Sequence, residues 1–144
     1  MNDKEKFIYP IGVVAKMLDI SVHTIRLYER EGLIIIRKTE TGRRIFSEKD
    51  IERLRCIRSF IMEKGLNIQG IKRFLSFLPC WRLNPNCSMK DYKNCPAYQQ
   101  SEVPCWALQE KPEICKEADC YACPVYNFPV DCTKIKTLLH GDTY

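Results

Sequence analysis

Residues 21–32 read SVHTIRLYEREG, and this stretch decides the fold of the first half of the chain. Ser21 is a favoured helix N-cap, because its hydroxyl can accept a hydrogen bond from a backbone N–H of the first turn. Val22 and Ile25 follow at helical spacing, and Gly32 can take the left-handed conformation that ends a helix. The stretch therefore predicts a short helix with a sharp end.

A second short helix is predicted just before it, over residues 11–18. Its apolar residues recur at the spacing of one helical face: Ile11, Val14, Ala15 and Leu18. The link from Leu18 to Ser21 is short, and two short helices joined in this way are typical of a helix-turn-helix.

The residues that follow predict a small hairpin and two further helices. Residues 33–36 and 43–46 are β-prone and flank a turn at 38–42, so they predict two short strands. Ser47 opens a third helix with an acidic residue at a capping-box position, and Gly65 stops it. Asn67 caps a fourth helix, which Pro79 closes.

The charge of the chain is uneven along its length. Residues 1–78 carry 16 Lys and Arg against 10 Asp and Glu, a net charge of +6, whereas residues 79–144 carry 7 against 8, a net charge of −1. The first half is therefore suited to a polyanion such as DNA. The alternative is an ordinary solvated basic face.

The chain has no apolar run long enough to span a membrane, and its first residues lack the apolar core of a signal peptide. We therefore expect a cytoplasmic protein without membrane contacts. Structural disulfides are rare in that reducing compartment, so its cysteines are read first as metal or redox ligands.

Several segments together resemble the MerR family. They are IGVVA (11–15), ISVHTIRLYEREGLI (20–34), GRRIFS (42–47) and DIERL (50–54), and GLNIQGI (65–71) looks most like the heat-shock-repressor branch. The resemblance covers residues 7–78. It implies a mainly α fold that begins with a winged helix-turn-helix of four helices and a two-stranded wing.

This fold implies a DNA-binding surface. The first turns of the helix after Ser21 can enter a major groove, and basic residues of the wing are suited to phosphates. Arg26 and Arg43 are the favoured contacts, whereas Tyr28 is expected to be packed or phosphate-bound, and His23 can be an ordinary exposed residue. The predicted DNA-binding residues are Ser21, Val22, His23, Thr24, Arg26, Tyr28, Lys38, Arg43 and Arg44.

The resemblance breaks off after the fourth helix. MerR regulators typically continue there into a long helix that pairs with a dimer partner, but Pro79 and Cys80 interrupt this chain. We expect a homodimer with a non-standard interface. Because MerR relatives distort the promoter between its recognition elements, we expect an indirect effect on RNA polymerase.

Eight of the nine cysteines lie between residues 80 and 132, in a pattern that occurs twice. CW at 80–81 and CPAY at 95–98 return as CW at 105–106 and CPVY at 123–126. The candidate metal ligands are Cys80, Cys87, Cys95, Cys105, Cys115, Cys120, Cys123 and Cys132. Cys56, on the predicted third helix, is read as a buried small residue.

An almost purely thiolate ligand set suits Fe–S clusters, zinc or Cu(I). The absence of two C-x-x-C pairs disfavours a simple zinc ribbon. Proline directly after Cys95 and Cys123 and the neighbouring aromatic residues favour an Fe–S cluster, of the [4Fe–4S] type, with zinc as the alternative. A thiol–disulfide switch or soft-metal sensing is a third possibility.

Residues 79–132 are rich in proline and lack periodicity, so we expect a small irregular domain stabilised by metal, with residues 133–144 forming a short helix or tail. The sequence thus predicts a transcriptional regulator that senses redox state, oxygen or metal. The alternative is a DNA-binding protein with a structural zinc module. An enzyme is disfavoured, because no cysteine sits in a nucleophile motif and no glycine-rich phosphate loop occurs.

Overall fold

The computed structural model describes residues 6–84, 94–111, 115 and 119–128. The chain forms two compact units, Met1–Gly65 and Leu66–Tyr144. No helix in the described part is long and apolar enough to cross a membrane. The predicted tail at 133–144 and the candidate ligands Cys87 and Cys132 lie outside the described residues.

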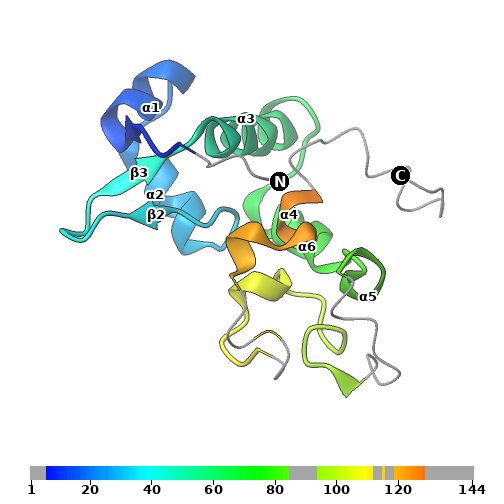
Figure 1. Cartoon of the computed structure of the whole chain (residues 1–144). Coiled ribbons are helices and arrows are strands. Elements are labelled where there is room, and N and C mark those ends of the chain that lie inside the picture. Colours follow the sequence, from blue (N-terminus) through cyan, green and yellow to red (C-terminus); the bar gives the residue numbers. More distant parts are fainter. Residues whose placement is uncertain (1–5, 85–93, 112–114, 116–118, 129–144) are drawn as a thin grey trace. The chain divides into compact units, whose positions relative to one another are not determined.

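The first unit contains the predicted helix-turn-helix. Helix α1 (Ile11–Leu18) contacts α2 (Val22–Arg30), and both are seen in Figure 1. The Ser21 hydroxyl accepts a hydrogen bond from the Thr24 N–H over 2.9 Å, which confirms the predicted cap. Gly32 has a φ of 79°, the left-handed conformation expected after α2.

A three-stranded antiparallel sheet takes the place of the expected two-stranded wing. Its strands β1 (Tyr9–Pro10), β2 (Arg37–Lys38) and β3 (Arg44–Phe46) are ordered β1-β3-β2. Tyr9 pairs with Phe46, so residues that precede the first helix supply the third strand. This strand was not predicted, because two residues are too few to show a β period.

The predicted strand at 33–36 was wrong. Leu33, Ile34 and Ile36 have no strand partner but are at most 8% exposed, so their side chains belong to the core of the first unit. A short apolar run is compatible with a strand and with an irregular core segment. Here its side chains are buried without forming a strand.

Helix α3 (Glu48–Met62) begins with a complete capping box. The Ser47 hydroxyl accepts from the Asp50 N–H, and the Asp50 carboxylate accepts from the Ser47 N–H over 2.9 Å. The helix contacts β3, and its Arg53, only 3% exposed, donates to the Leu33 carbonyl over 2.9 Å. This bond gives a hydrogen-bond donor to the Leu33 carbonyl, which has no strand partner.

The second unit begins with α4 (Ile68–Ser76), whose cap Asn67 accepts from the Gly70 N–H over 2.7 Å. Its other described elements are short: α5 (Cys80–Leu83), η3 (Cys105–Ala107), η5 (Cys120–Ala122) and α6 (Pro124–Asn127). The irregularity predicted after residue 79 is confirmed for the described segments. Stabilisation by metal stays a prediction.

Candidate functional site

A basic face runs along α2. His23, Arg26 and Arg30 are exposed at helical spacing, whereas Ile25 is fully buried on the opposite side. His23 and Arg26 were predicted from the sequence, whereas Arg30 was not. Its position four residues after Arg26 was the available signal.

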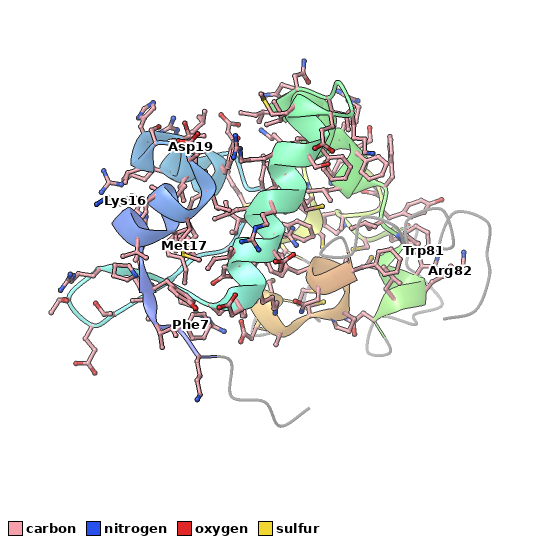
Figure 2. The ribbon with its side chains drawn as sticks, turned by 90° about the horizontal axis from the view of Figure 1, so that it is seen from above. Phe7, Lys16, Met17, Asp19, Trp81 and Arg82 are labelled. Atoms are coloured by element: carbon pink, nitrogen blue, oxygen red, sulfur yellow. The ribbon has the colours of Figure 1, made fainter. Side chains whose placement is uncertain are left out.

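The neighbouring end of α1 adds another cation to the first unit. Lys16 and Met17 project from α1 in Figure 2, and both are exposed. Asp19, just beyond the helix, has a φ of 54° and ends it in a left-handed turn. Lys16 is a second exposed cation that the sequence analysis did not include.

The hairpin of β2 and β3 is tied to α2 through one acidic residue. The Arg44 guanidinium lies 2.8 Å from the Glu29 carboxylate and donates a second hydrogen bond to it over 2.9 Å. Lys38 lies 4.0 Å from the same carboxylate. Glu29 thereby positions the hairpin beside α2, and Arg43 is exposed just after the hairpin turn.

The other predicted DNA-binding residues have local structural partners. Tyr28 is 6% exposed, and burial raises the pKa of its phenol, which fits the packed alternative. The Ser21 and Thr24 hydroxyls lie 2.8 Å apart at the start of α2, and Val22 beside them is half-buried. Which of these residues touch DNA stays a prediction.

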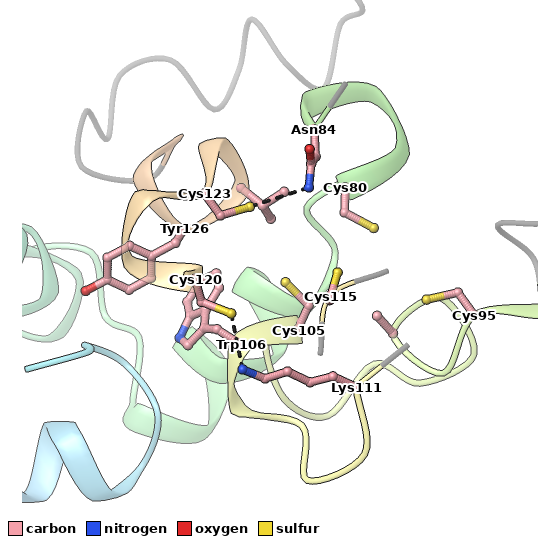
Figure 3. A pocket seen from close by; sticks show the side chains of 12 residues that line it. Cys80, Asn84, Cys95, Cys105, Trp106, Lys111, Cys115, Cys120, Cys123 and Tyr126 are labelled. Carbon is pink, nitrogen blue, oxygen red and sulfur yellow. Dashed lines mark hydrogen bonds between the residues drawn. The ribbon is translucent and has the colours of Figure 1, made fainter. Parts of the chain in front are cut away.

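The second unit contains a cavity of about 40 Å³ that is lined by six cysteines (Figure 3). Trp106, Val125 and Tyr126 form much of its apolar wall. The cysteines come from both copies of the repeated pattern: Cys80, Cys95, Cys105, Cys115, Cys120 and Cys123. The structure therefore brings together every candidate ligand that lies in the described part of the chain.

Two N–H donors point at sulfur atoms in this cavity, as Figure 3 shows. The Lys111 ammonium lies 3.2 Å from the Cys120 sulfur, and the Asn84 amide lies 3.8 Å from the Cys123 sulfur. Each donor helps to hold the position of the sulfur that it contacts. Neither residue was predicted from the sequence, because nothing in the cysteine spacing points to them.

One of the cavity cysteines, Cys105, has a strongly perturbed thiol. Burial raises the pKa of its thiol to about 12, and the neighbouring Cys123, Cys120 and Cys115 add to this effect. A thiol in this position stays protonated at neutral pH unless a cation compensates the thiolate.

The described side chains do not form a finished metal site. Within the described segments, no three His, Cys, Asp or Glu side chains meet in the arrangement of a bound metal ion. The metal ligands and the type of centre therefore stay predictions. Cys56, on α3 of the first unit, is 8% exposed, which confirms its predicted burial, but it is disulfide-bonded rather than a free thiol.

Comparison with known proteins finds relatives of the first part of the chain. Residues 9–78 match the family model described as "MerR HTH family regulatory protein". The HTH-type transcriptional regulator GlnR of Bacillus anthracis is 37% identical over 68 residues, which are 47% of this chain and 52% of the relative. A protein described as heat shock protein HspR, from Streptomyces coelicolor, is 35% identical over 68 residues, covering 47% and 45%.

A solved structure of HiNmlR, a MerR family regulator lacking the sensor domain and bound to promoter DNA, is 33% identical in sequence. The match covers 46% of this chain and 52% of the HiNmlR chain, with a TM-score of 0.43. The chain spans about half the length of the curated relatives it matches. Over residues 9–78, the chain belongs to the MerR family of helix-turn-helix regulatory proteins.

Proposed function

We propose that the chain binds double-stranded DNA and regulates transcription. The observation that carries this proposal is the exposed basic face of α2, formed by His23, Arg26 and Arg30, within the region that matches the MerR family. A recognition helix reads bases from its first turns, and hairpin cations such as Arg43 are suited to phosphates.

The test is DNA binding by the full chain, after enrichment of a random double-stranded library on it. Arg26→Ala should cost about 1–3 kcal/mol and relax the sequence preference. Arg43→Ala should weaken binding to all sequences and lower the salt slope by about 1. Arg82→Ala, which removes an exposed charge on α5, is the matched control. No enrichment at low salt, or equal losses in all three variants, contradicts the proposal.

We further propose that the cysteine-lined cavity holds a metal centre, either an Fe–S cluster of the [4Fe–4S] type or zinc. The convergence of six cysteines on one cavity supports this, because thiolates are the preferred ligands of both. Loss or oxidation of the centre would reshape the cysteine-rich region and alter DNA binding. The chain would thereby sense redox state, oxygen or metal.

Anaerobic purification with metal and sulfide analysis tests this second step. Iron and sulfide in stoichiometric amounts, with DNA affinity that changes on exposure to air, are the expected result. Stoichiometric zinc with DNA affinity insensitive to oxidants favours the structural zinc module instead. A colourless protein without iron, sulfide or zinc contradicts the metal centre.

Assembly and partners follow from the same proposal. We infer a homodimer with a non-standard interface, since α5 ends at Leu83 after a single turn. The dimer would act on RNA polymerase through the shape of the promoter and carry out no catalysis. Light scattering of the full chain checks the mass, and a monomer on a two-fold symmetric operator contradicts the dimer.

A further inference from the structure

The doubled cysteine pattern is also a doubled local structure. In the first copy the Pro79 carbonyl accepts from the Arg82 N–H over 2.9 Å. In the second copy the Pro104 carbonyl accepts from the Ala107 N–H, also over 2.9 Å. Each Cys-Trp pair therefore opens a tight helical turn behind a proline.

An aromatic contact closes each copy in the same way. The Trp81 and Tyr98 rings meet edge-on with centroids 5.1 Å apart, and the Trp106 and Tyr126 rings meet edge-on at 5.0 Å. Edge-to-face contact is a preferred geometry of aromatic pairs. The tryptophan at the start of each copy thus packs on the tyrosine at its end.

Burial separates the two copies. Tyr126 is 1% exposed and Trp106 8%, whereas Tyr98 is 41% exposed. Tyr121 packs on the second copy, with its ring centroid 5.8 Å from that of Tyr126. The aromatic pair of the second copy is therefore buried more deeply than the tyrosine of the first, although Cys95 of the first copy is itself only 5% exposed.

The second copy also has ligand spacing that the first lacks. Cys120 and Cys123 form a C-x-x-C pair, a spacing at which two sulfurs commonly bind one metal ion. Cys120 begins η5, and Cys123 is the N-cap of α6. Cys105 and Cys115 line the same cavity as this pair.

We propose that Cys105, Cys115, Cys120 and Cys123 form a single four-thiolate site for a thiophilic metal, and that the first copy supplies no ligand. This inference rests on the proposed metal centre and identifies its ligands. Binding exchanges four S–H bonds for four sulfur–metal bonds and releases four protons to solvent. The sulfurs must draw together, since no metal-ready group is formed in the described part of the chain.

Lys111 is a positioning residue of this site. Four thiolates around a divalent ion, or around a [4Fe–4S] core of the same charge, form a dianion. The Lys111 ammonium, 3.2 Å from the Cys120 sulfur, offsets part of that charge and donates to the ligand.

Anaerobic titration of the full chain with Co²⁺ tests the ligand set, because thiolate ligation produces intense charge-transfer absorption. We expect one Co²⁺ per chain. Cys115→Ser and Cys120→Ser should abolish the band, whereas Cys80→Ser and Cys95→Ser, the first-copy controls, should keep it. Loss of the band in either control variant contradicts the proposed ligand set, and so does binding of two Co²⁺ per chain. Both outcomes leave the proposal of a metal centre intact. Absence of Co²⁺ binding contradicts both the ligand set and the metal centre. None of these outcomes tests the proposed DNA binding.

Alkylation of the unsubstituted chain tests the ligand set without any variant that could misfold. Alkylation of the native chain should be slowed by Zn²⁺ at the four proposed ligands but not at Cys80, and equal protection of Cys80 contradicts the assignment. Lys111→Gln should weaken Co²⁺ binding about tenfold, while Lys111→Arg should restore most of it. Iron and sulfide in the purified protein identify a cluster, and zinc without sulfide identifies a single ion.

Discussion

The two units of this chain are stabilised in different ways. The first has a core of fully buried apolar side chains, such as Ile25, Phe46 and Leu54, between helices with good caps. In the second, the described elements after α4 are short turns, and Trp106, Tyr121 and Tyr126 are buried near a cysteine-lined cavity. The first fold can be supported by apolar burial alone, whereas the proposed ligation would supply stability that the short turns of the second lack.

Removal of metal should have the largest effect, and only on the second unit. Structural zinc sites contribute on the order of 10 kcal/mol of apparent binding free energy, which becomes folding free energy. We expect a chelator to remove hydrogen-exchange protection from the backbone around η3, η5 and α6. Protection of α1–α3 should stay unchanged. Equal loss in both units would break the contrast.

Phe46→Ala should produce the opposite pattern. Phe46 is fully buried on β3, so its truncation should cost about 3–5 kcal/mol of the free energy of unfolding of the first unit. Urea denaturation followed by hydrogen exchange in α1 and α2 measures this loss. Ile8→Ala, at a residue 62% exposed, is the control and should change stability by less than about 0.5 kcal/mol. Metal binding that weakens with Phe46→Ala would show that the units depend on each other.

The two equivalent tyrosines sharpen the comparison inside the second unit. Tyr126→Ala removes a buried ring and should weaken Co²⁺ binding as well as local stability, whereas Tyr98→Ala removes a ring that is 41% exposed. We expect the Tyr126 variant to lose clearly more of both. Equal losses would mean that the first copy is as essential to the site as the second.

The smallest expected effect concerns the ion pair that joins α2 to the hairpin. Glu29→Gln should cost at most about 1 kcal/mol of stability, because the partner Arg44 is 24% exposed and Glu29 is 20% exposed. It should lower DNA affinity because the hairpin loses its anchor on α2, although removal of the carboxylate makes the net charge more positive. Tighter binding would show that charge outweighs positioning. Glu63→Gln, an exposed carboxylate beyond α3, is the matched control for charge.

Local signals in the sequence predicted most of the first unit and the helix α4 that opens the second. The caps at Ser21, Ser47 and Asn67 and the left-handed glycines Gly32 and Gly65 all occur where the sequence places them. Such features depend on a few neighbouring residues and their hydrogen bonds, so sequence reveals them. The strand β1 escaped notice, since its existence depends on pairing with β3, far along the chain.

The sequence by itself determined the helix-turn-helix, the basic face of α2 and the doubled cysteine pattern, because periodicity and composition are local properties. Tertiary packing alone shows that both copies share one cavity and that Tyr126 of the second is buried whereas Tyr98 of the first is exposed. It also placed Lys111 and Asn84 beside sulfur atoms. Cysteine spacing limits which sulfurs can meet, but packing of the aromatic residues decides which of them lose contact with water.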